Sequence, residues 1–452
     1  MVSSARAAGA ADVLNTPPTK ETTLASGLRV ASESSGDDTA TVGVFINAGS
    51  RFETDANNGT AHFLEHMAFK GTSTRSQNAL EREIENMGGH LNAYTSREQT
   101  VYYAQVLKDD IPKAVDILAN ILQDSTLDED AIERERSVIL REAEEVAKDT
   151  TEVVFDLLHA GAYAGTPLAR TILGPEENIR SITKADLQDY IATHYTTENM
   201  VVAAAGDVDH DSLCSLAESA FAALPKGPSG SSPAPPHVES KFLGTAMTQA
   251  DPNVPLAHFA LALEGVGWTH PDSFALMVAQ TMIGSWDRAS GGGKHVASPL
   301  AHLVANNDLA HSINSFHTVY SDTALWGVHA VTEPKNLDDL IYVIEQEWVR
   351  LSFSVSDKEV ERARNQLKTS ILMQLDGSAA VAEDIGRQML TYRRRLTPAE
   401  IFARIDAVDA DTIKRVANEL FYNKSPSIAA VGSLDGMPDY ARLESWNWWL
   451  RA

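Results

Sequence analysis

The sequence has little that could stabilise a fold covalently or anchor it in a membrane. A single cysteine, Cys214, excludes an internal disulfide framework and any zinc or iron–sulfur site built from several cysteines. The longest uninterrupted apolar runs, such as Met200 to Ala205, are far shorter than the roughly 18 residues that a transmembrane helix needs. The fold must therefore come from burial of apolar side chains, and 452 residues are enough for two or three domains.

Basic residues are also scarce, because 37 Lys and Arg stand against 62 Asp and Glu, a formal net charge of −25. An acidic excess of this size repels phosphate backbones and argues against a general nucleic-acid-binding protein. It attracts cationic partners, of which a basic peptide is one. The acidity could equally serve solubility alone, so charge by itself does not decide between these readings.

Two segments of biased composition indicate how the chain is organised. Residues 1–20 are rich in Ala, Ser and Pro and predict a flexible N-terminal tail. A Pro-, Gly- and Ser-rich stretch predicts a linker at 225–240. We therefore expect two domains, one at 21–224 and the other at 241–452.

A weak internal repeat suggests that these two domains are homologous. The stretch from Tyr195 to Asp209 resembles the stretch from Tyr422 to Asp435, and their shared glycines, Gly206 and Gly432, are 226 residues apart. Each half mixes strands with pairs of helices rather than alternating them regularly. The sequence therefore predicts an α+β fold of two homologous α/β-sandwich domains, each a mixed sheet covered by helices.

The strongest chemical signal is the segment from His62 to His66, on a helix predicted to begin near Thr60. Histidines four residues apart lie on one helical face, so both imidazoles can bind the same metal ion. Glu65 shares that face and could polarise a metal-bound water without being a ligand. This is the H-x-x-E-H order, the reverse of the commoner H-E-x-x-H. The alternative is an ordinary helix with two unrelated histidines.

A catalytic zinc usually takes three protein ligands, so a third must come from elsewhere in the first half. In the helix predicted at 128–148, Glu135 and Glu142 occupy the apolar stripe that contains Ile132 and Ile139. Buried carboxylates are costly unless they are paired or bind a metal. The alternative is that both carboxylates simply pair with Arg136, Arg141 or other cations.

These motifs together resemble those of the inverted-zincin, pitrilysin-type peptidases, and among them the β subunits of mitochondrial processing peptidases. The similarity covers nearly the whole chain after residue 20. It is carried by H-x-x-E-H followed 76 residues after His66 by Glu142, and by the segments Gly59–Gly71, Gly88–Ser96 and Glu135–Glu145.

The resemblance assigns roles to the residues of the metal motif. It implies that His62, His66 and Glu142 bind one Zn²⁺ per chain and that Glu65 is the general base. Glu135 matches a further acidic position of the motif, where it would support the metal ligands from behind.

The resemblance also implies substrate-binding residues. Glu152 and Asp156 would receive an arginine that lies just before the cleavage site, and a carboxylate pair suits a guanidinium group. Asn92 and Tyr94 lie on a predicted strand, His90 to Thr95, that would accept the peptide as an added β-strand.

The activity implied is that of a zinc metalloendopeptidase that removes basic N-terminal presequences from imported precursors in the mitochondrial matrix. It would work as a heterodimer with a homologous non-catalytic α subunit. The domain at 21–224 would be catalytic and the domain at 241–452 would not, because no H-x-x-E-H follows residue 240.

Related chains offer an alternative, because some are structural core subunits of respiratory complex III. Such a subunit would lie on the matrix face of the inner membrane and contact cytochrome b, cytochrome c1 and the Rieske protein. The complete metal set favours an active peptidase, either free or within complex III. An independent bacterial-type peptidase of the same family is a further option.

Overall fold

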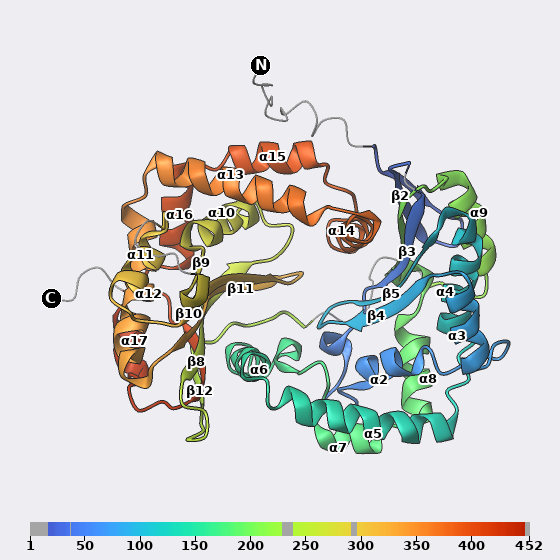
Figure 1. Ribbon diagram of the computed structural model, residues 1–452, viewed down its shortest axis with the longest axis horizontal. Helices are drawn as coiled ribbons and strands as arrows, with labels where there is room; N and C mark the ends of the chain where they lie inside the picture. Colours follow the sequence, from blue (N-terminus) through green and yellow to red (C-terminus); the bar gives the residue numbers. More distant parts are fainter. Residues whose placement is uncertain (1–16, 37, 228–237, 291–295, 448–452) are drawn as a thin grey trace. The chain divides into compact units, whose positions relative to one another are not determined.

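The architecture comes from a computed structural model, which describes residues 17–36, 38–227, 238–290 and 296–447 (Figure 1). Within these residues the chain forms two compact units, each built around one six-stranded sheet. Both sheets are mixed and covered by helices, so the predicted α+β class is confirmed. Most of the predicted tail and linker, residues 1–16 and 228–237, lies outside the described residues.

The first unit draws its described residues from 1–141, 171–237 and 372–403. Its strands are β1 (Lys20–Thr23), β2 (Arg29–Ser34), β3 (Thr39–Ile46), β4 (His90–Thr95), β5 (Thr100–Leu107) and β6 (Met200–Gly206). The strand order is β1-β2-β6-β3-β5-β4, and only the pair β2 and β6 is parallel. Strand β4 therefore forms one edge of this sheet.

Alternation along the strands gives the first sheet two apolar faces. Val42 and Val44 of β3 face the larger core, which the N-terminal helices complete. Phe45 points to the other face, where it packs with Ile385 and Met389 from the C-terminal half. The helices of this unit are α2 (Thr60–Met67), α3 (Gln77–Asn86), α4 (Ile111–Gln123), α5 (Glu129–Val146), α7 (Glu176–Ser181), α8 (Lys184–His194), α9 (His210–Ala220) and α14 (Ser378–Thr391), with short 3₁₀ turns η1 (Ser50–Phe52), η2 (Lys108–Asp110) and η4 (Thr197–Asn199).

The second unit draws its described residues from 142–170, 238–371 and 404–452. Its strands are β7 (Ala246–Ala250), β8 (Ala257–Val266), β9 (Ser285–Asp287), β10 (Ser312–Val319), β11 (Thr323–Thr332) and β12 (Ser427–Gly432). The order is β7-β12-β8-β11-β10-β9, with β7 and β12 parallel. The predicted repeat is visible in it, because Gly206 and Gly432 end the equivalent strands β6 and β12 with φ of 112° and 108°.

The second sheet is also covered on both faces. Val154 and Leu158 pack against Ala260 and Ala429 on one face, and Trp326 packs among helices on the other, donating from Nε1 to the Leu276 carbonyl (3.1 Å). The helices of this unit are α6 (Thr150–Ala162), α10 (Ser273–Ile283), α11 (Pro299–Asn306), α12 (Leu337–Phe353), α13 (Asp357–Gln374), α16 (Ala410–Leu420) and α17 (Tyr440–Ser445), with 3₁₀ turns η3 (Pro167–Ala169), η5 (Arg288–Ser290) and η6 (Pro334–Asn336). Helix α15 (Pro398–Asp406) belongs to the first unit as far as Ala403.

Each sheet receives one helix from the other half of the chain. Figure 1 shows α14, coloured near the red end, beside the blue strands of the first sheet, and teal α6 beside the second sheet. Helices α5, α13 and α15 each cross the division between the units, α5 doing so between Arg141 and Glu142. Each compact unit is thus built from three separate segments of the chain. The division into two homologous domains at 21–224 and 241–452 stays a prediction. No helix in the described ranges combines the length and apolarity needed to cross a membrane.

Candidate metal centre

Helix α2 carries the H-x-x-E-H residues and begins at a glycine that no other residue could replace easily. Gly59 is its N-cap and has φ of 105°, which favours glycine. A Cβ at Gly59 would lie 2.6 Å from the Leu173 carbonyl oxygen. Ala61, Phe63 and Leu64 of the helix pack into the larger core of the first unit, which turns the histidines away from that core.

Three predicted metal ligands converge. The rings of His62 and His66 lie 4.8 Å apart between centroids at 67°. One ligand atom from each of His62, His66 and Glu142 lies within 4.8 Å of the other two, and His62 is only 6 % exposed. Among the described residues this is the only such group of three or more His, Cys, Asp and Glu side chains. Two imidazoles and a carboxylate make a donor set that fits a catalytic zinc with one position left for water.

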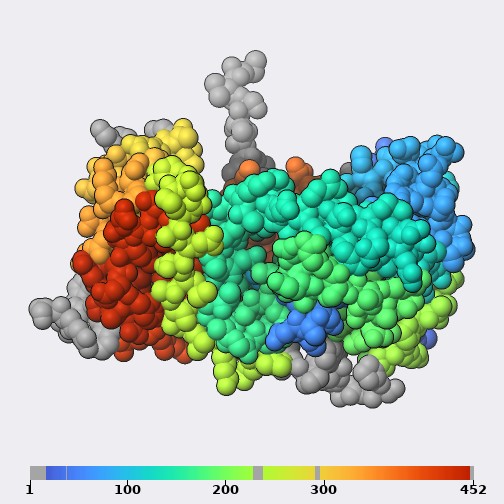
Figure 2. All heavy atoms as spheres, turned by 90° about the horizontal axis from the view of Figure 1, so that it is seen from below, coloured from blue at the N-terminus to red at the C-terminus, as the bar shows by residue number. Residues whose placement is uncertain are grey.

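The helix that supplies Glu142 also supplies Glu135, two turns earlier. Glu135 is 8 % exposed, and its Oε2 lies 3.3 Å from Nδ1 of His66. Hydrogen bonding at Nδ1 leaves Nε2 of the same ring to face a metal. The outer side of this helix is exposed, and Figure 2 shows the teal segment along the surface.

The partner of Glu135 is a residue that the sequence motif did not identify. Lys70 Nζ lies 2.6 Å from Glu135 Oε1, so the carboxylate bridges an ammonium group and an imidazole. The arginines considered as partners contact other groups: Arg136 pairs with Glu133 at 2.9 Å, and Arg141 donates to the Ser137 carbonyl. The sequence signal for Lys70 was a cation just beyond the end of the metal-motif helix, available to a buried carboxylate that needed one.

Glu65, the predicted general base, is half-buried beside a pair of tyrosines. The hydroxyls of Tyr102 and Tyr195 lie 3.0 Å apart. Burial, and then the neighbouring Tyr195 hydroxyl and the negative charge of Glu65, raise the pKa of Tyr102 well above its usual value. Burial and the charge of Glu65 also raise the pKa of Tyr195. Both hydroxyls therefore stay protonated near neutral pH, and Glu65 lies close enough for its charge to act on them.

The predicted peptide-binding strand is β4, whose outer edge has no strand partner among the described residues. Asn92 is exposed, whereas Tyr94 points to α14 and donates to Glu383 Oε1 at 2.5 Å. Burial, followed by the charge of Glu383, raises the pKa of Tyr94. Tyr94 therefore attaches this edge strand to a helix from the C-terminal half rather than presenting its hydroxyl to solvent.

The predicted arginine-binding pair belongs to the second unit. Glu152 lies in the first turn of α6 and is exposed, and Asp156 lies one turn later and is half-buried. Asp149 caps this helix by accepting hydrogen bonds from the Thr151 and Glu152 amides. The two carboxylates share a helical face, as expected, but neither belongs to the cluster around α2.

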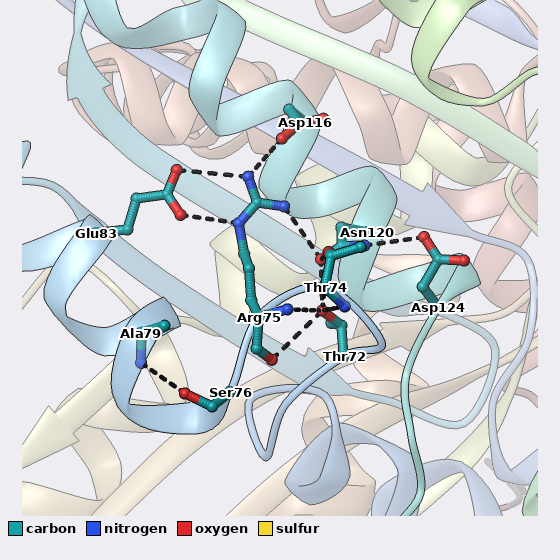
Figure 3. Close-up of polar contacts among 9 residues, drawn as sticks. All are labelled: Thr72, Thr74, Arg75, Ser76, Ala79, Glu83, Asp116, Asn120 and Asp124. Atoms are coloured by element: carbon teal, nitrogen blue, oxygen red, sulfur yellow. Dashed lines mark hydrogen bonds and ion pairs between the residues drawn. The ribbon is translucent and has the colours of Figure 1, made fainter.

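The loop after α2 is held by an arginine that sequence reasoning missed. Arg75 forms ion pairs with Glu83 of α3 (2.8 Å) and Asp116 of α4 (2.5 Å), and it donates to Asn120 Oδ1 (3.1 Å), as Figure 3 shows. Asn120 Oδ1 also accepts a hydrogen bond from the Thr72 hydroxyl (2.6 Å). The loop that follows α2 is therefore tied to α3 and α4 of the same unit.

Comparison with known proteins gives matches over nearly the whole chain. Residues 29–176 match the model for the insulinase family, peptidase family M16, and residues 181–367 match the model for the M16 inactive domain. The human mitochondrial-processing peptidase subunit beta is 57 % identical over 439 residues, covering 97 % of this chain and 89 % of that protein. A probable mitochondrial-processing peptidase subunit beta from Arabidopsis thaliana is 55 % identical, covering 97 % and 83 %.

A solved structure has the same fold. A chain of complex III₂ from Candida albicans, determined with Inz-5 bound, superposes with a TM-score of 0.86 at 28 % identity, covering 95 % of this chain and 100 % of that one. The resemblance predicted from the motifs is thus confirmed. The chain belongs to peptidase family M16, and within it to the group of mitochondrial-processing peptidase β subunits.

Proposed function

We propose that this chain is the catalytic subunit of a zinc metalloendopeptidase that removes basic N-terminal presequences from precursors imported into mitochondria. The observation that carries the proposal is the convergence of His62, His66 and Glu142, with Glu135 behind them. The domain models and the 55–57 % identity to processing-peptidase β subunits support the same activity. It would act in the mitochondrial matrix.

In this mechanism His62, His66 and Glu142 hold the ion. Zinc, when bound, supplies a Lewis acid that polarises the scissile carbonyl and makes water a better nucleophile near neutral pH. Glu65 accepts a proton from the attacking water and delivers it to the leaving amine. Glu135 orients the His66 ring through Nδ1, and Lys70 holds Glu135 in place.

Substrate binding uses main-chain and charged groups. The outer edge of β4, which no other described strand pairs with, would offer its backbone groups to an extended peptide, with Asn92 and Tyr94 on the strand. Main-chain bonds give affinity without demanding one sequence, which suits presequences of many different proteins. Glu152 and Asp156 would bind the arginine before the cleavage site. The net charge of −25 would raise the local concentration of basic peptides.

The partner we propose is a homologous non-catalytic α subunit, as the name "subunit beta" of the relatives implies. A second role, as a structural core subunit of ubiquinol:cytochrome c reductase, is favoured by the likeness to a chain of complex III₂. In that assembly the neighbours would include cytochrome b, cytochrome c1 and the Rieske protein, on the matrix face of the inner membrane. The two roles are compatible.

One experiment separates them. Solubilised mitochondria from the source organism are fractionated by native size, and each fraction is assayed for this chain and for chelator-sensitive cleavage of a basic presequence peptide. Cleavage that travels with the respiratory complex identifies a bifunctional core subunit, and cleavage near 100 kDa, about twice the 49.0 kDa of this chain, identifies a free heterodimer. If the chain is present but its fractions cleave nothing, the peptidase proposal is wrong.

A further inference from the structure

The segment Gly49–Glu53, which precedes α2, contacts both the N-terminus of α2 and the turn after β4. It contains the 3₁₀ turn η1 and is buried apart from Phe52, which is half-buried. Arg51 and Glu53 are each only 4 % exposed. Two charged side chains this deeply buried need strong partners, and none of the proposed catalytic steps uses either of them.

Glu53 binds the N-terminus of the metal-motif helix. Its Oε2 accepts hydrogen bonds from the Gly59 amide (2.9 Å) and from Asn58 Nδ2 (2.8 Å), and its Oε1 accepts one from the Ala61 amide (2.7 Å). The N-cap Gly59 has no side chain of its own to do this. The first amides of a helix have no intrahelical partner, and a negative charge there is favourable. Glu53 thus fixes the backbone directly before His62.

Arg51 binds the turn that ends the edge strand. Its Nη1 lies 2.6 Å from Glu98 Oε1, in a pair whose side chains are 3 % and 10 % exposed. Its amide donates to the Arg97 carbonyl at 2.8 Å. A Cβ at Gly49 would lie 2.2 Å from the Ser96 carbonyl oxygen, so the two backbones approach closely here. Residues 96–99 join β4 to β5, and this contact therefore fixes the C-terminal end of β4.

We propose that Gly49–Glu53 is a positioning segment, which holds the metal-motif helix α2 at a set distance from the peptide-accepting edge β4. Glu53 is the positioning residue for the helix, and the Arg51–Glu98 pair is the positioning contact for the strand. The proposal rests on the proposed function, since it assigns both ends of the segment to that site. Strand addition decides where each peptide bond lies along β4, whereas α2 carries Glu65 and two of the three metal ligands, His62 and His66. A shift of about 1 Å between the two can cost roughly 100-fold in rate.

The first test changes Glu53 without changing its size. Glu53→Gln keeps the side chain buried but replaces one accepting oxygen by an NH₂ group that faces backbone donors. We expect zinc affinity to fall roughly 10- to 100-fold, the visible spectrum of the Co²⁺-substituted chain to change, and kcat to fall with KM nearly unchanged.

The control for Glu53→Gln is Asp209→Ala. Asp209 caps helix α9 of the same unit by accepting from the Ser212 amide at 2.8 Å. This variant also removes a carboxylate that caps a helix, and with it the stabilisation that the cap gives the folded chain. It should leave zinc affinity and the Co²⁺ spectrum unchanged.

The second test changes the strand end of the segment. Arg51→Lys keeps the positive charge but loses the planar fork that meets Glu98. On a synthetic presequence peptide with a single arginine, in the presence of the α partner, we expect several-fold higher KM and additional cleavage at neighbouring bonds. The zinc affinity of Arg51→Lys should equal that of the unaltered chain. A misfolded variant would instead lose zinc affinity.

The outcomes separate the two proposals. If the unaltered full chain binds no zinc and cleaves no peptide with its partner, the proposed function fails. If it binds zinc and Glu53→Gln matches it in affinity, Co²⁺ spectrum and kcat, the positioning role of Glu53 is wrong. Should Glu53→Gln not fold, Arg51→Lys decides, and an unchanged cleavage position with unchanged KM overturns the positioning segment.

Discussion

The clearest quantitative prediction concerns Glu345 of α12, in the core of the second unit. This side chain is 0 % exposed, and neither carboxylate oxygen has a hydrogen-bond partner within the described structure. Burial raises the pKa of Glu345 from 4.5 to about 9. Near neutral pH the folded chain therefore holds a proton on Glu345, and the unfolded chain releases it.

The sign of the pH effect follows from this proton. Below pH 4.5 Glu345 is protonated in both states, so its contribution to stability is fully present. Between its unfolded pKa of 4.5 and its folded pKa of about 9, unfolding releases one proton and stability falls as the pH rises. The slope is about 1.4 kcal/mol per pH unit, so about 2.7 kcal/mol should be lost between pH 6 and pH 8.

The assay compares the unaltered chain with Glu345→Gln, which cannot ionise. All seven tryptophans lie after residue 238 in the sequence, and the five among the described residues belong to the second unit, so tryptophan fluorescence during urea unfolding reports mainly on that unit. The free-energy difference between the two proteins should move in favour of Glu345→Gln by about 2.7 kcal/mol from pH 6 to pH 8. Glu361→Gln, at an exposed position of α13, is the matched control. A difference that stays constant with pH would refute the reasoning.

Three further predictions follow from the site and the packing. Glu65→Gln should lower peptide cleavage at least about 100-fold while zinc content, measured by elemental analysis, stays at one per chain; unchanged turnover would remove Glu65 as the base. Alanine at Glu152 and Asp156 together should raise KM about tenfold for a peptide with arginine before the cleavage site, and much less for its citrulline analogue; equal effects on both peptides would contradict arginine binding. Gly386→Ala should destabilise the first unit by about 1–3 kcal/mol in urea unfolding followed by circular dichroism, because its Cβ would lie 2.3 Å from the Phe45 ring, and a more stable variant would show that α14 can move aside.

Local patterns in the sequence predicted the elements that carry the site. The helix start near Thr60 agrees with α2, and the strand predicted from His90 to Thr95 agrees with β4. Such agreement is expected where hydrophobic period and glycine signals coincide, because these act within a few residues. The helix predicted at 128–148 is observed as α5, Glu129–Val146, which is one residue shorter at its start and two residues shorter at its end.

Part of the candidate metal centre was also readable from sequence. His62 and His66 share a helical face by spacing alone, and the apolar stripe of α5 marked Glu135 and Glu142 as inward-facing acids. That Glu142 approaches the two histidines was expected only from the family resemblance. Spacing along one helix places residues on a face but does not say which other helix that face meets.

The remaining features depend on contacts between residues far apart in the chain. Lys70 pairs with Glu135, and Tyr94 hydrogen-bonds to Glu383, across 65 and 289 positions. No local sequence pattern indicates that α6 covers the second sheet and α14 the first. The apolar face of an amphipathic helix can pack on either sheet.

The sequence by itself therefore determined the local features of this protein: a helix with two histidines on one face, a second helix with two acids in its apolar stripe, a strand from His90 to Thr95 and an acidic net charge. The tertiary structure alone decided which buried charges meet, including Glu53 on the N-terminus of α2 and Arg51 on the turn after β4. The physical reason is that burial makes every charged group need a partner, but the topology of the sheets and their covering helices chooses that partner.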